Sequence, residues 1–149
     1  MADPHDLQRF VVAQSELCSY PEVLDEIRCG RKRGHWIWFI FPQLRGLGTT
    51  EYANRFGIGS LAEATAYLRH PQLGPRLREC ARGLAGTPAQ GPIRGMVGEV
   101  DALKIRSSMT LFIAAADDLP EARADFQAVL DRFYGGEPDP RTTAMLNSA

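Results

Sequence analysis

The chain has 149 residues, of which 44% are hydrophobic and 23% charged, a composition that suits one folded domain and excludes bulk disorder. Its formal net charge of −1 lacks the basic excess of nucleic-acid-binding domains, so we do not expect a nucleic-acid partner. The longest strongly apolar run, residues 36–41, is far shorter than the about 20 residues of a membrane span, and we expect no membrane association.

The number and spacing of the three cysteines indicate a reducing compartment. Cys18, Cys29 and Cys80 form no C-x-x-C pair, and none lies near a histidine at metal-ligand spacing. An odd number of separated cysteines is typical of free thiols in a reducing environment. The N-terminal residues MADPHDLQRF also lack the apolar run of a signal peptide. We therefore expect a cytoplasmic protein with no metal site and no cofactor.

The first elements in chain order are two helices. Apolar residues at helical spacing predict a helix over about residues 4–18, with Asp3 and Pro4 as its N-cap and first residue. The residues Ser19-Tyr20-Pro21-Glu22 have the spacing of a capping box and predict the start of a second helix. Gly30 can end that helix in a left-handed conformation.

The next segment, residues 30–48, reads GRKRGHWIWFIFPQLRGLG and has no helical period. Pro42 and several glycines argue against a long regular element, and one strand without a partner is unstable. We therefore expect an extended or 3₁₀ segment whose aromatic side chains pack between helices.

Residues typical of helix starts and ends recur along the rest of the sequence. One or two helical turns are expected over residues 50–56, and Ser60 to Glu63 has capping-box spacing that opens a helix ending at Pro71. Further helices are expected from about 75 to 84, 99 to 116, 118 to 134 and from 140, with a flexible Gly- and Pro-rich loop over 87–98. The inward stripe expected on the helix over 99–116 is Val100, Leu103, Ser107, Leu111 and Ala114.

Strand alternation is almost absent, which indicates an all-α fold. We expect residues 1–149 to form a single compact, irregular multi-helix domain. It would have about six to eight helices and one extended aromatic segment.

Four segments together resemble a known family. They are residues 30–48 and three stretches of the form AxAYLRHPxLGxRL (64–77), DxLKxRSSMTLF (101–112) and FQxVLDRFYxGxxDxxT (126–142). The chain resembles an uncharacterised bacterial family of domains of unknown function, number 1810, whose members are sometimes mislabelled as calpastatin. The resemblance implies a compact helical fold and carries over no activity, substrate or cofactor.

The first candidate site lies in the basic stretch from Arg28 to Arg45, which holds five Arg or Lys and no acid. Clustered cations attract phosphate or carboxylate, and Trp36 and Trp38 could offer flat faces to a ring. The alternative is that both tryptophans belong to the core. The cationic and titratable residues of this candidate site are Arg31, Lys32, Arg33, His35 and Arg45.

The second candidate lies on the helix expected over 99–116. Asp101, Lys104 and Ser108 lie along one helical face, and a lysine beside hydroxyls can hold a phosphate. The alternative is a surface pair between Asp101 and Lys104, with hydroxyls bonding back to the helix. The remaining polar residues of this candidate are Arg106, Ser107 and Thr110.

Our leading hypothesis joins the two candidates in one pocket for an anionic small molecule, such as a nucleotide or a phosphate ester, with hydrolase-type chemistry as one option. The candidate catalytic residues are His35, Asp101 and Lys104. The candidate binding residues are Arg31, Arg33, Trp36, Trp38, Gln43, Arg45, Ser107 and Ser108. The alternative is a non-catalytic module that docks an acidic protein or a nucleic-acid backbone on the Arg28–Arg45 stretch, and a homodimer that buries the aromatic run is a third option.

Overall fold

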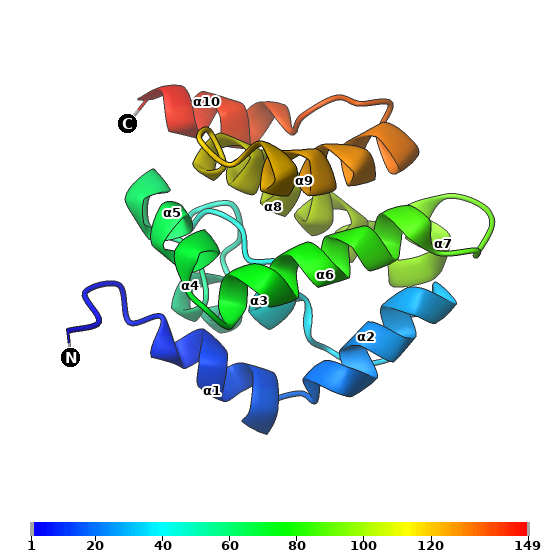
Figure 1. The fold of residues 1–149 in the computed structure, drawn as a ribbon, viewed down its shortest axis with the longest axis horizontal. Helices are drawn as coiled ribbons and strands as arrows, with labels where there is room; N and C mark the ends of the chain where they lie inside the picture. The colour runs from blue at the N-terminus through cyan, green and yellow to red at the C-terminus, as the bar shows by residue number, and fades with distance from the viewer. Residues whose placement is uncertain (1, 149) are drawn as a thin grey trace.

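The computed structural model describes residues 2–148, and regular structure in this part of the chain is helical (Figure 1). An isolated bridge between Leu44 and Ile58 is the β-type pairing present. The helices are α1 (Gln8–Glu16), α2 (Tyr20–Cys29), α3 (Ile37–Ile40), α4 (Glu51–Arg55), α5 (Leu61–Arg69), α6 (Leu73–Gly86), α7 (Ile93–Val97), α8 (Glu99–Ala115), α9 (Pro120–Phe133) and α10 (Pro140–Ser148). The all-α prediction is confirmed, although residues 2–148 contain ten helices rather than six to eight.

The long helices pack around α6 and α8. α6 contacts α2, α5 and α9, while α8 contacts α5, α7, α9 and α10. Figure 1 shows α6 crossing the middle of the molecule between α1 and α2 on one side and α9 and α10 on the other. The short helix α3 contacts α1, α6 and α8, so the aromatic segment lies where the two halves of the chain meet. No helix within the described range is long and apolar enough to cross a membrane.

The helix ends agree in part with the expected caps. Ser60 accepts a hydrogen bond from the backbone N–H of Glu63 at 3.1 Å, and Gly30 adopts φ 66°, so both of these predictions are confirmed. Ser19 is the N-cap residue of α2, so the predicted start of this helix is confirmed, but its side chain makes no capping hydrogen bond. The predicted N-cap at Asp3 is wrong, because α1 begins at Gln8 with Leu7 as its N-cap, although the Asp3 carboxylate accepts hydrogen bonds from the N–H groups of Leu7 and Gln8.

The aromatic segment differs over its central residues from the expected extended or 3₁₀ conformation. Residues 37–40 form one helical turn, and the N–H of Phe41 donates to the carbonyl of Ile37 at 2.9 Å. Backbone polar groups in a buried segment need partners, and no neighbouring strand offers them here, so a local helical turn satisfies them instead. The flanking residues on both sides remain irregular.

Two further expectations are wrong. The loop expected over 87–98 contains α7, whose Ile93 and Met96 are buried. On α8, Val100 and Leu103 are largely exposed instead of facing the core. Apolar residues occupy most of the α8 circumference, so helical spacing alone offers more than one inward stripe. The buried face contains Ala102, Ile105, Met109 and Phe112.

Candidate functional site

Two segments that lie far apart in the sequence meet where α8 crosses the aromatic segment. Lys32 Nζ lies 2.9 Å from the Asp101 carboxylate, and Lys104 Nζ lies 3.6 Å from the same group. Each lysine also lies over an indole ring, Lys32 at 5.1 Å from the Trp36 centroid and Lys104 at 4.7 Å from that of Trp38. Cations over indole faces are attracted by the ring quadrupole, so the two lysines and two tryptophans stabilise one another around Asp101.

Trp36 belongs to the core. Its side chain is 1% exposed, and its Nε1–H donates to Glu26 at 3.0 Å. Burial raises the pKa of Glu26, but hydrogen bonds from the Arg33 and Gly34 amides and from Trp36 outweigh it, so the pKa is lowered overall. The ionised Glu26 therefore holds this indole in place, and Trp36 has no free face for a ligand ring. The structure therefore places Trp36 in the core, the alternative that the sequence left open.

Trp38, Gln43 and Lys104 line a small hollow between α3, α4 and α8. Its volume is about 10 Å³, which is close to the space that one water molecule occupies. Gln43 is 9% exposed, and its amide has no hydrogen-bond partner between residues 2 and 148. A nucleotide does not fit inside this hollow, although a single oxygen atom would.

Two buried polar atoms, one on α3 and one on α8, have no partner in the described chain. They are Trp38 Nε1 and Ser108 Oγ, and both residues were candidates from the sequence. An unpaired buried donor costs about 1–3 kcal/mol, so such atoms are rare in folded proteins and call for a reason. Among residues 2–148 these are the two buried side-chain polar atoms that lack a hydrogen-bond partner.

The other hydroxyls of α8 have structural partners. Ser107 Oγ bonds to the Asp139 carboxylate at 3.0 Å, and Thr110 Oγ1 accepts from the Asp139 amide at 2.8 Å. Asp139 in turn accepts from the Thr142 amide at the start of α10. Ser107 therefore anchors α10, and its expected role in binding is replaced by this one.

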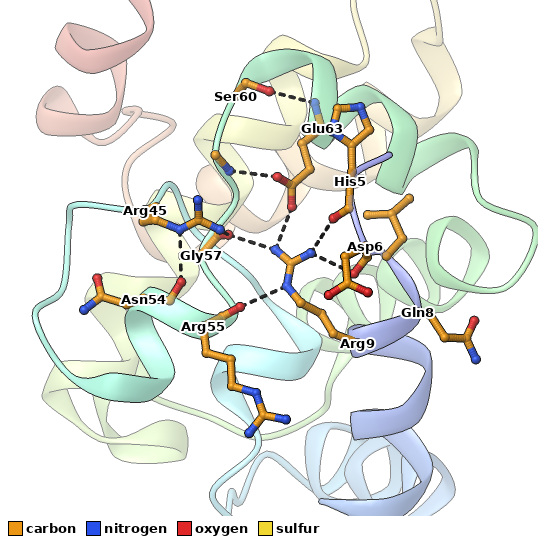
Figure 2. Close-up of polar contacts among 12 residues, drawn as sticks. His5, Asp6, Gln8, Arg9, Arg45, Asn54, Arg55, Gly57, Ser60 and Glu63 are labelled. Atoms are coloured by element: carbon orange, nitrogen blue, oxygen red, sulfur yellow. Dashed lines mark hydrogen bonds and ion pairs between the residues drawn. The ribbon is translucent and has the colours of Figure 1, made fainter. Parts of the chain in front are cut away.

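The remaining cations of the basic stretch lie elsewhere. Arg31 and Arg33 line an open groove of about 600 Å³ beside the acidic residues of α2, and His35 is exposed. Arg45 donates to the carbonyls of Asn54 at 3.0 Å and Gly57 at 2.9 Å, as Figure 2 shows. These four residues therefore do not converge on the hollow with Lys104.

A buried ion pair that was not expected from the sequence ties α1 to the first turn of α5. Arg9 and Glu63 approach to 2.7 Å, with side chains 11% and 8% exposed (Figure 2). The guanidinium makes five hydrogen bonds, one to Glu63 and four to backbone carbonyls, including that of Gly57. The partners are 54 residues apart in the sequence, so no local pattern signals them.

The comparisons with known proteins agree with the motifs. The family model described as "Protein of unknown function (DUF1810)" matches residues 4–146. The crystal structure of the conserved hypothetical protein Rv1873 from Mycobacterium tuberculosis is similar, with 51% identity, a TM-score of 0.90, and coverage of 97% of this chain and 99% of that one. No curated protein matches the chain. Because the family model covers nearly the whole sequence, this chain belongs to the DUF1810 family.

Proposed function

We propose that the chain binds an anionic small molecule at the hollow between α3, α4 and α8. Lys104 would supply the charge, and Trp38 and Gln43 would supply neutral hydrogen-bond donors. The observation that carries the proposal is the buried Trp38 Nε1 that has no acceptor among the described residues. An oxygen atom of a carboxylate or phosphate is the acceptor that this donor lacks.

Lys104 suits this role better than Lys32. The Lys32 side chain is 8% exposed, and its ammonium bonds to the Gly34 carbonyl and to Asp101. Lys104 is 21% exposed, and besides its position over Trp38 its ammonium has, within residues 2–148, only the 3.6 Å approach to Asp101, which is too long for a hydrogen bond. Lys104 therefore retains N–H donors for a ligand, while Asp101 keeps both lysines in position.

The size of the hollow limits what enters it. One head-group oxygen would sit inside, after a small displacement of the Gln43 or Lys104 side chain, because Trp38 Nε1 is fully covered. The rest of the molecule would lie outside, near Tyr52, whose ring is 5.2 Å from that of Trp38 and partly exposed. Nucleotides and other phosphate esters have this form, a charged end on a larger body.

Nuclear magnetic resonance of the two indole N–H groups tests the proposal directly. The protein labelled with ¹⁵N is titrated with inorganic phosphate, acetate and adenosine monophosphate. We expect the Trp38 signal to shift as its N–H gains an acceptor, while the Trp36 signal stays fixed because Glu26 already holds it. Saturable shifts of Trp38 alone would support the site, and an unmoved Trp38 signal at millimolar anion would refute it.

Charge-removing variants locate the binding site. Lys104→Gln is expected to raise the Kd read from the Trp38 shifts at least tenfold, since one charge-assisted hydrogen bond contributes about 1.5–3 kcal/mol. Arg31→Gln removes an equal charge from the other groove and is the matched control. If Arg31→Gln had the larger effect, the alternative of an acidic partner docking on the basic stretch would replace the proposal.

The setting that we propose is a bacterial cytoplasm. Cys18, Cys29 and Cys80 are all unpaired, as expected for thiols in a reducing compartment. The similar structure of Rv1873 also comes from a bacterium.

A further inference from the structure

A second hollow lies on another part of the molecule, between the α5–α6 corner and the start of α9. It has two lobes of about 350 Å³ and 410 Å³, and both are lined by Leu68, Arg78 and Leu119. This size suits a small organic ligand. None of its lining residues belongs to the hollow at Trp38, so ligand binding here is independent of the proposed function.

Three arginines give this groove its binding chemistry. Asp125 Oδ2 accepts from both Arg78 Nε at 2.8 Å and Arg82 Nη1 at 2.9 Å, so two cations share one carboxylate. Both terminal nitrogens of Arg78 then have no partner within residues 2–148. Arg69 at the rim is held by Asp118 through one terminal nitrogen. A guanidinium with two free terminal nitrogens can bind phosphate or carboxylate through two parallel hydrogen bonds.

His70 adds a neutral donor to the same groove. Its Nδ1 accepts the backbone N–H groups of Gln72 at 3.1 Å and Leu73 at 3.2 Å. A ring nitrogen that accepts two hydrogen bonds carries no proton, so Nε2 carries it and can donate. The backbone at the start of α6 therefore fixes the tautomer in which Nε2 carries the proton, and His70 lines one lobe of the groove.

Most of the remaining lining is apolar. Pro71 and Pro75 line one lobe and Pro120 lines the other, each with a fixed φ angle, and Leu68 and Leu119 line both lobes. Glu121 lines one lobe and carries the opposing charge. The groove thus combines an arginine fork with an apolar wall.

We infer that this groove binds an organic anion, a phosphate ester or carboxylate that carries an apolar or ring-shaped body. Arg78 and Arg69 would bind the anionic group, and the leucines and prolines would contact the body. The apolar wall predicts that phenyl phosphate binds more tightly than inorganic phosphate, and the guanidinium fork predicts that phenol binds hardly at all.

Isothermal titration calorimetry of the full chain with phenyl phosphate, benzoate, inorganic phosphate and phenol tests the inference. Arg78→Gln should raise Kd at least tenfold, equivalent to about 1.4 kcal/mol. Glu121→Gln should lower Kd, because it removes a repulsive carboxylate from the lining. Arg123 is an exposed arginine on α9, the helix of Glu121, and does not line the groove, so Arg123→Gln should leave Kd unchanged.

Two further variants control for a loss of folding and for binding at the other site. If Arg78→Gln unfolds the protein, Arg69→Gln replaces it, since that side chain is mostly exposed, and a threefold weaker Kd is expected. Lys104→Gln should not change binding in this groove, which separates it from the site at Trp38. Equal losses with Arg123→Gln, equal affinity for phenyl phosphate and inorganic phosphate, or no binding at millimolar ligand would each overturn the inference.

Discussion

Replacing Arg9 with methionine should cost the protein a large part of its stability. The change leaves Glu63 as a buried carboxylate without its cation and removes a donor from four backbone carbonyls. Removing one partner of a buried pair costs about 3–5 kcal/mol. Both side chains are about one-tenth exposed, so we expect the lower end, about 3 kcal/mol. For a chain of this length that lowers Tm by about 6–12 °C.

A double-mutant cycle isolates the charge effect. Glu63→Gln keeps an oxygen for the Gly59 amide, which Glu63 accepts at 3.1 Å, and removes the charge. We expect Arg9→Met with Glu63→Gln to recover about 1–2 kcal/mol relative to Arg9→Met alone. Arg55→Met, a neighbouring exposed arginine, is the control and should change the unfolding free energy by less than about 0.5 kcal/mol.

Urea unfolding followed by circular dichroism measures the wild-type protein and these variants. A cost below about 1 kcal/mol for Arg9→Met would refute the assignment of a buried pair, since such a pair cannot be broken so cheaply. A double variant that loses the sum of both single changes would also refute it, because the charges would then be uncoupled.

Two further predictions concern a close backbone approach and an acid-sensitive contact. Gly57→Ala should destabilise by about 1–3 kcal/mol, because its Cβ would meet the Ala53 carbonyl oxygen at 2.6 Å, whereas Gly95→Ala faces open space and should be neutral or slightly stabilising in thermal unfolding. Burial raises the pKa of Asp139, but hydrogen bonds from Thr142 and Ser107 outweigh this effect, so the folded pKa lies below the ordinary value of 3.8. The contribution of Asp139 to stability is therefore present above pH 3.8 and is lost as the pH falls through the lower folded pKa. Hydrogen exchange should therefore show α10 loosening in acid in the native protein, and Asp139→Asn should loosen α10 already at neutral pH; equal exchange in both proteins at pH 7 would contradict this.

The fold was largely predictable because its signals are local. A capping serine at Ser60 and a left-handed glycine at Gly30 mark helix ends through contacts within four residues, and both appear where expected. The errors arose where local signals were ambiguous. α8 is apolar around most of its surface, so Val100 looked like a core residue, and a four-residue helix such as α3 is shorter than the period needed to detect it.

The candidate site was predictable in part. The basic residues beside the aromatic run at 36–41 suggested a meeting of this segment with α8, and Lys104 of α8 does lie over the indole of Trp38. The sequence could not show which cations converge, because that depends on tertiary packing. Arg45 bonds to a loop carbonyl, and Ser107 bonds to Asp139, which is 32 residues away. Contacts at such separations have no periodic pattern, and only the folded chain reveals them.

The tie between Arg9 and Glu63 also has a consequence for synthesis on the ribosome. α1 leaves the ribosome before α5, and Glu63, the carboxylate that pairs with Arg9, follows 54 residues later. Until then Phe10, which is fully buried in the folded protein, lacks the aromatic neighbours Phe56 and Tyr67 that cover it. The apolar face of α1 therefore stays uncovered until α5 has been synthesised, so nascent chains that stall before α5 should be prone to chaperone capture and aggregation.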